Sequence, residues 1–139
     1  MMDRTHLTAW GLTLAGLIPF VGLAVLIVLS PREGERWVEP LTVYGAIILS
    51  FLAGTRWGKA FAERDPRPAT LIFSNLPPVA AWLTFLPGVP DRLQFLVLMI
   101  GLGAMLYWDV RGSNDWYSRL RWVATLGAVA SLGTVAVLF

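Results

Sequence analysis

Few residues in this chain of 139 could take part in acid–base, nucleophilic or metal chemistry. There is no cysteine and a single histidine, His6, which excludes thiolate metal sites, cysteine nucleophiles and a site built from several imidazoles of one chain. The motifs of phosphate-binding glycine loops and of zinc proteases are missing. No carboxylate lies near the middle of an apolar stretch, as a proton pump would need. We therefore expect a protein that is not an enzyme and that carries neither a metal nor another cofactor.

Arginine and tryptophan residues gather where the apolar stretches of the chain begin and end. A planar guanidinium suits phosphate because it donates two hydrogen bonds at once, so these residues form a candidate site for anionic lipid headgroups or for an acidic partner. The same pattern is typical of an aromatic belt whose arginine side chains extend to the headgroup region. The candidate residues are Arg56, Trp57, Arg119, Arg121 and Trp122.

Asp109 is the acidic residue expected among these cations. It closes one apolar stretch, as Arg56 closes another, and the two residues should therefore lie at the same membrane depth. An unpaired charge at that depth is costly. The sequence thus predicts an ion pair between Arg56 and Asp109.

Two consecutive prolines lie within the third apolar stretch. Pro77 and Pro78 remove backbone donors, and the carbonyl groups so released need other partners inside a membrane. Ser74 and Asn75 lie just before them and could supply hydrogen bonds. The pattern predicts either a discontinuous helix that lines a small polar cavity or a proline kink with Asn75 packed against a neighbouring helix.

Small residues recur every four positions in the second apolar stretch, at Ala46, Ser50, Gly54 and Gly58. Such a stripe allows close backbone approach, which supplies much of the packing between helices in lipid. It predicts packing inside the bundle or, alternatively, a face for a second copy or a partner helix. We expect the second helix to be central, because a smooth face suits close neighbours on more than one side.

The elements that position these residues are expected to be membrane helices. Hydrophobic residues make up 56% of the chain and charged residues 14%, against about 25% charged in soluble domains. These values argue against a water-soluble enzyme, a nucleic-acid-binding protein and a disordered chain. Because about 20 helical residues cross a ~30 Å hydrocarbon layer, we expect one all-α domain over residues 1–139. Its five transmembrane helices are predicted at approximately 7–30, 38–57, 69–87, 93–108 and 120–139.

The distribution of lysine and arginine predicts the orientation of this bundle. Five crossings place the termini on opposite sides, and the side richer in these residues is expected to face the cytoplasm. We therefore place the N-terminus in the cytoplasm and the C-terminus outside. The N-terminal side holds Arg4, Arg56, Lys59, Arg64, Arg67, Arg111, Arg119 and Arg121, and the other side holds Arg32, Arg36 and Arg92.

Several segments taken together resemble a known family. They are 14–20, 44–58, 75–82 and 108–121, of which the second and the last are the most specific. The pattern is similar to that of the transmembrane protein 69 family, small multi-pass proteins of bacteria and mitochondria catalogued as a domain of unknown function. This resemblance implies a compact helical protein of an inner membrane, and the lack of transit-peptide features favours the bacterial one.

Three functions remain open at this point. The first is a non-enzymatic accessory, assembly or interaction factor for a larger membrane complex, acting on a membrane-protein partner or a second copy. The second is a small oligomeric channel or transporter that uses the helix break at 75–78. The third is a protein that binds a lipid, such as an anionic one, or another hydrophobic small molecule. Besides the bilayer itself these are the partners we expect, and nucleic acid is not among them.

Overall fold

The computed structural model of the chain describes residues 3–30, 32–64 and 66–139. Within these residues the secondary structure is entirely helical, which confirms the predicted all-α class. The elements are α1 (Arg4–Leu29), a short 3₁₀ helix η1 (Gly34–Trp37), α2 (Val38–Ala62), α3 (Pro68–Leu83), α4 (Asp91–Val110) and α5 (Asp115–Leu138).

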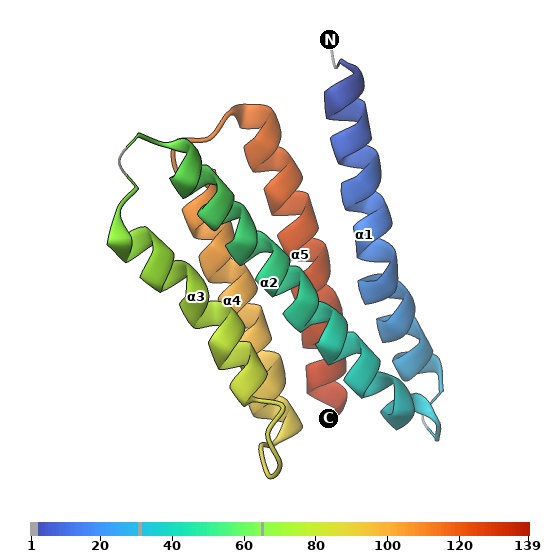
Figure 1. Cartoon of the computed structure of the whole chain (residues 1–139). Coiled ribbons are helices and arrows are strands. Elements are labelled where there is room, and N and C mark those ends of the chain that lie inside the picture. Colours follow the sequence, from blue (N-terminus) through green and yellow to red (C-terminus); the bar gives the residue numbers. More distant parts are fainter. Residues whose placement is uncertain (1–2, 31, 65) are drawn as a thin grey trace.

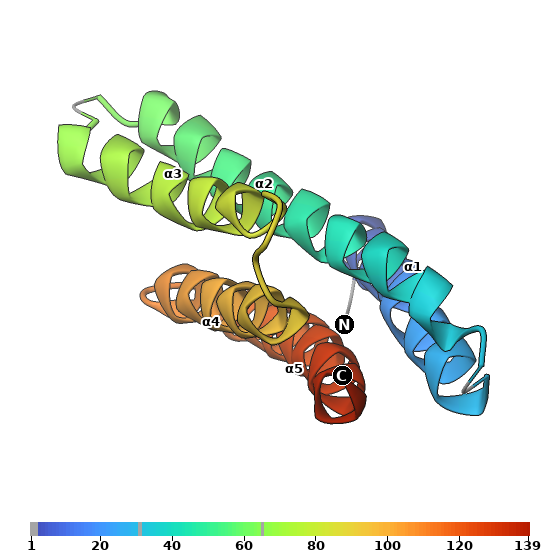
Figure 2. The same ribbon diagram turned by 90° about the horizontal axis from the view of Figure 1, so that it is seen from below.

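The five α-helices run alternately up and down as a bundle (Figure 1). Seen along its length, α3, α2 and α1 form one layer and α4 and α5 form a second (Figure 2). The start of α1, the end of α2 and the connection from α4 to α5 lie at the same end of the bundle, at the top of Figure 1. This end is called the N-terminal end below.

Local signals in the sequence begin and connect the helices. The Asp3 carboxylate accepts a hydrogen bond from the backbone N–H of His6 at 2.8 Å and so caps the start of α1. Pro68 occupies the first turn of α3, where a missing N–H costs nothing. Between α1 and α2 the chain turns so tightly at Gly34 that a Cβ there would lie 2.7 Å from the carbonyl oxygen of Ile27. Only glycine fits this turn.

The predicted helix bounds differ most at the charged ends. α2 continues to Ala62 instead of ending near 57, and α5 begins at Asp115 instead of near 120. The apolar stretch marks only the part of a helix that suits hydrocarbon, whereas backbone hydrogen bonding continues into polar residues. α3 ends at Leu83, before the predicted 87, because the chain tightens into turns that lead to Pro87 and to Gly88 at φ 89°.

Of the two alternatives predicted for the third helix, the interruption is wrong, and the packing of Asn75 against a neighbouring helix expected with a kink is not seen either. α3 is one helix from Pro68 to Leu83 and passes through Pro77 and Pro78. The Ser74 hydroxyl and the Asn75 amide both donate to the carbonyl oxygen of Leu71, at 2.9 and 2.7 Å, so they bond within their own helix. Asn75 is exposed and lines no break, and the channel hypothesis loses the feature that motivated it.

α2 is central, as expected, since it contacts each of the other four α-helices. It does so through its apolar face, on which Leu41, Gly45, Leu49 and Leu52 are buried. Gly101 of α4 packs directly against Leu49: a Cβ at Gly101 would lie 2.8 Å from a Leu49 methyl group. The largest fully buried apolar side chains of the bundle are Phe20, Phe95, Leu41, Leu49, Leu98, Leu102, Met105, Leu132 and Val135.

By length and composition, four segments among the described residues suit a membrane crossing. They are Arg4–Leu29, Gly34–Ala62, Asp91–Val110 and Asp115–Leu138. α3 has 16 residues, which makes it about 24 Å long at 1.5 Å per residue, and it falls short of a ~30 Å hydrocarbon layer. The structure thus supports four of the five predicted crossings.

Candidate functional site

A buried charge cluster joins α2, α4 and α5 at the N-terminal end of the bundle. Arg56 approaches one oxygen of the Asp109 carboxylate, with Nε and Nη2 at 2.7 and 2.6 Å from Oδ1. The Nε of Arg121 donates to the other oxygen, Oδ2, at 2.9 Å. Side-chain exposure is 11% for Arg56, 3% for Asp109 and 5% for Arg121. The structure therefore brings together the pair expected from the sequence and adds a second arginine to it.

The two guanidinium groups compensate a carboxylate in an unfavourable place. Asp109 lies one residue before the end of α4, where the helix dipole presents partial negative charge, and burial removes the water that would solvate it. Arg56 also lies 5.0 Å from the centre of the Trp108 ring, a cation–π contact. With two cations and one anion, the cluster keeps a net positive charge.

Arg121 is not fully satisfied by these contacts. Its Nη1 donates to the Thr125 hydroxyl at 3.3 Å. Its Nη2 is buried and has no hydrogen-bond partner among the described residues. An unbonded buried donor costs about 1–3 kcal/mol, so this nitrogen retains the capacity to bind an acceptor.

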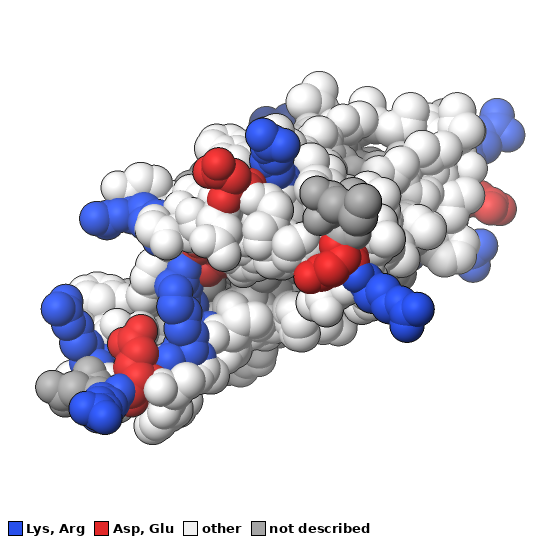
Figure 3. Space-filling view, turned by 90° about the horizontal axis from the view of Figure 1, so that it is seen from above, with Lys and Arg blue, Asp and Glu red and all other residues white. Residues whose placement is uncertain are grey.

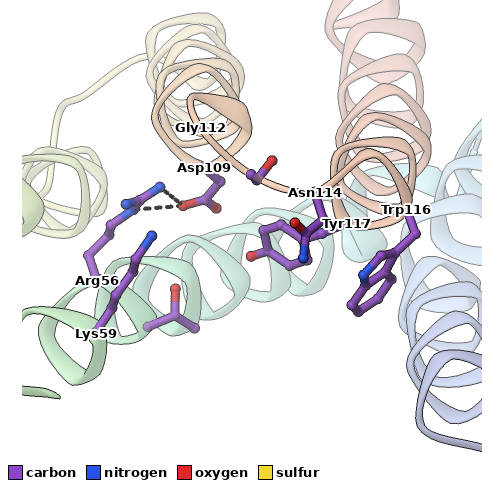
Figure 4. A pocket seen from close by; sticks show the side chains of 9 residues that line it. Arg56, Lys59, Asp109, Gly112, Asn114, Trp116 and Tyr117 are labelled. Carbon is purple, nitrogen blue, oxygen red and sulfur yellow. Dashed lines mark hydrogen bonds and ion pairs between the residues drawn. The ribbon is translucent and has the colours of Figure 1, made fainter.

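A polar cavity of about 340 Å³ opens beside the cluster. Figure 4 shows Arg56 and Lys59 projecting from α2 towards Asp109, with Tyr117 reaching in from α5. Gly112 allows the tight connection of α4 to α5, since it adopts φ 72°, a backbone conformation that side chains disfavour. The lining residues are Thr55, Arg56, Lys59, Asp109, Gly112, Ser113, Asn114, Trp116 and Tyr117.

The remaining members of the predicted anionic site do not join this cavity. Arg119 is exposed while Arg121 is buried, because residues two apart on a helix point in nearly opposite directions. Trp57 contacts Phe61 along the outside of α2, and Trp122 is 49% exposed on α5. The predicted group of five therefore divides into two buried arginines and three outward-facing residues. Figure 3 shows further lysine and arginine side chains spread over this end of the molecule, with acidic ones between them.

The small-residue stripe of α2 faces away from the bundle. Ser50, Gly54 and Gly58 are exposed, and Ala46 is half-buried. A Cβ built at Gly54 or at Gly58 would have no neighbour within 4 Å among the residues that the structure describes. Ala46 thus packs against the apolar core, whereas the other three stripe residues do not, and the close glycine contacts among the described residues lie elsewhere, at Gly34, Gly101 and Gly127.

Comparison with known proteins identifies the family. The family described as Protein of unknown function (DUF3429) matches residues 5–137. The chain belongs to this family. Transmembrane protein 69 of Xenopus tropicalis is 35% identical over 124 residues, 85% of this chain, and Transmembrane protein 69 of Mus musculus is 32% identical over 123 residues, 84% of this chain. The resemblance noted from sequence segments is confirmed.

The two relatives are longer proteins. The chain spans about half of their length, 49% and 50% respectively. No solved structure is similar to the chain. The names of the relatives and the four long apolar helices support a membrane protein.

Of the residues that line the cavity, only Arg56 and Asp109 were among the predicted site residues, and Lys59 and Tyr117 are two that the sequence reasoning missed. Lys59 lies beyond the apolar part of α2, and Tyr117 lies before the apolar part of α5. Their position in the sequence could have identified them. Lys59 lies three residues after Arg56 and Tyr117 lies four residues before Arg121, so each shares a helix face with a predicted site residue. Among the described residues, no group of three or more His, Cys, Asp or Glu side chains is placed to hold a metal ion.

Proposed function

We propose that this protein is a non-enzymatic, multi-pass protein of the bacterial inner membrane that acts as an accessory or assembly factor by binding a helix of another membrane protein. The observation that carries the proposal is the outward small-residue face of α2. A Cβ at Gly54 or at Gly58 would meet no other described residue within 4 Å, although glycine in a helix costs about 1 kcal/mol relative to alanine. A helix packed closely from outside would use them.

The spacing of the exposed side chains on this face supports a helix as the occupant. The intervals alternate between four and three residues, the 3.5-residue period with which one helix packs along another at a small crossing angle. Bulky apolar side chains lie towards the two ends and small ones lie in the middle, where two backbones would come closest. The exposed positions that follow this spacing are Val43, Ile47, Ser50, Gly54, Trp57 and Phe61, and Gly58 is exposed next to Trp57.

The proposal includes the orientation and the fifth crossing. α2 ends at the N-terminal end of the bundle, and α4 begins at the opposite end. The segment between these two helices therefore runs along the length of the bundle. α3 is proposed to make that crossing, lengthened by the turns after Leu83. With this crossing, the larger number of lysine and arginine residues lies on the side of the N-terminus, which favours a cytoplasmic N-terminus.

Site-specific photo-crosslinking in native membranes tests the docking face. A photoreactive residue at the exposed position Ile47 is expected to give an adduct with one other membrane protein. The same residue at Ile18, which is exposed on α1, should not give it. Gly54→Leu should abolish the adduct because it fills the close-approach site without touching the bundle. Gly22→Leu is the matched control, since a Cβ there also meets no other described residue within 4 Å.

Three results would overturn the proposal. An adduct at twice the mass of the chain would assign the face to a second copy. Adducts with lipid alone would mean that the face is only a lipid-exposed surface. Equal loss of the adduct in Gly54→Leu and Gly22→Leu would show that general disturbance of the helices, not occlusion of this face, removes it.

A further inference from the structure

An apolar groove of about 450 Å³ is lined by residues of α1, α2 and α5 and by Leu102 of α4. Its volume falls in the range of about 300–1,000 Å³ typical of ligand sites. Most of its wall is aliphatic or aromatic, from Leu12, Leu17 and Phe20 on α1 to Phe51 on α2. The polar side chains of the wall are those of Thr13, Thr55, Tyr117, Arg121 and Thr125.

The groove adjoins the polar cavity. Thr55 and Tyr117 line both of them, so the two spaces share a wall at the level of the charge cluster. The charged cavity and the apolar groove therefore lie next to each other. This is the shape of a site for a molecule with one polar head and one long apolar chain.

The charge of the combined site favours an anionic head. Three cations face it, Arg56, Lys59 and Arg121, against the one carboxylate of Asp109. That carboxylate already pairs with two of them. The buried Nη2 of Arg121 has no partner among the described residues, and Arg121 lines the groove. An anion placed here would meet uncompensated positive charge in a site of low dielectric constant.

Two contacts hold α1 in place along the groove. The His6 ring stacks on the Trp116 indole, with centroids 4.0 Å apart, at the N-terminal end. Further along, the Tyr44 hydroxyl donates to the Gly16 carbonyl at 2.7 Å and ties α1 to α2. The groove is therefore bounded by fixed helices on both sides.

We propose that this site binds a single-chain anionic amphiphile, with its carboxylate or phosphate head beside Arg56 and Lys59 and its acyl chain in the groove between α1, α2 and α5. The site is independent of the outward face of α2 proposed for partner binding. An experiment that contradicts one of the two proposals therefore does not contradict the other.

The test uses the purified, delipidated full chain and native mass spectrometry. The probes are palmitate and palmitoyl lysophosphatidate, which present the two head groups on the same chain. One bound molecule per chain is expected, and the tighter probe identifies the head group. Lys59→Ala is expected to weaken binding about tenfold, the loss of one charge-assisted hydrogen bond. Arg119→Ala, which removes an exposed cation outside the site, should not.

A second variant tests the groove without touching the charges. Ala124 is half-buried on the groove wall, so Ala124→Phe should fill it and abolish binding, whereas Ala80→Phe on the exposed face of α3 should leave binding intact. A circular dichroism spectrum and melting curve equal to those of the wild type show that each variant is folded.

Several outcomes would overturn the inference. Equal binding of the uncharged palmitoyl glycerol would remove the requirement for an anionic head. Equal binding of inorganic phosphate would remove the requirement for a chain. Unchanged binding by folded Lys59→Ala and Ala124→Phe would place the amphiphile elsewhere on the protein.

Discussion

Arg121 of α5 donates through Nε to Asp109 of α4 at 2.9 Å, and side-chain exposures of 5% and 3% make this one of the most buried ionic contacts of the bundle. Arg56 of α2 occupies the other oxygen of the same carboxylate. One acidic side chain thus connects three helices. Replacing Asp109 should therefore destabilise the packing of all three helices.

Asp109→Asn is predicted to destabilise the bundle strongly. The substitution keeps the shape of the side chain but leaves two buried guanidinium groups without a counter-charge, and breaking a buried pair in this way costs about 3–5 kcal/mol. The free energy of unfolding in detergent measures the effect. Asp115→Asn, at an exposed position in the first turn of α5, is the matched control. Equal stability of the two variants would contradict a structural role for the cluster.

Removing all three charges should restore stability. The triple variant Arg56→Met, Asp109→Leu, Arg121→Met replaces the cluster by apolar side chains of similar length, an exchange that is often neutral or stabilising. It should therefore unfold at a higher denaturant concentration than Asp109→Leu alone. A triple variant no more stable than that single variant would mean that lost packing, not uncompensated charge, accounts for the damage.

Gly101→Ala and Gly103→Ala should have opposite effects on stability. A Cβ at Gly101 would lie 2.8 Å from a Leu49 methyl group, so the α2–α4 contact has to open, at about 1–3 kcal/mol. A Cβ at Gly103 meets nothing within 4 Å, and the variant should gain up to about 1 kcal/mol of helix propensity. Thermal unfolding of both proteins in the same detergent gives the comparison. Destabilisation of the same size in both would argue against the α2–α4 packing described above.

Tyr44→Phe is predicted to loosen α1. The substitution removes the hydrogen bond from the Tyr44 hydroxyl to the Gly16 carbonyl, and such interhelical bonds contribute about 0.6 kcal/mol on average in membrane proteins. Hydrogen–deuterium exchange of α1 should rise, with a small loss in melting temperature. Tyr107→Phe, at a 66% exposed position, should change neither. A Tyr44→Phe protein with unaltered exchange would show that the other α1 contacts suffice.

The proposed orientation predicts a labelling pattern for introduced cysteines. The chain has none of its own, so single-cysteine variants are unambiguous. A membrane-impermeant maleimide added to intact cells should label Glu33→Cys and Gly88→Cys, and it should label Arg64→Cys and Arg111→Cys only after the cells are opened. Labelling of residues 64 and 88 from the same side would show that α3 does not cross the membrane.

Composition and hydropathy were enough to predict the class of this protein. An all-helical membrane bundle follows from long apolar stretches joined by short charged ones, because only helices satisfy their backbone groups along such stretches in lipid. The pairing of Arg56 with Asp109 also followed from one-dimensional information. Two opposite charges at the same membrane depth have few other partners.

The rotation of each helix about its axis was decided only by the tertiary structure. Arg119 and Arg121 are equivalent in a hydropathy profile, yet they point about 200° apart on α5, and only Arg121 reaches Asp109. The stripe from Ala46 to Gly58 was visible in the sequence, but its outward direction was not, because the opposite face of α2 offers larger apolar side chains for the core. The prolines of α3 led to the wrong prediction of a helix break for a related reason. Pro77 and Pro78 lie within a continuous helix because α3 packs against α2 and α4. A sequence fixes which residues share a helix face, whereas packing against the other helices selects the face that is buried.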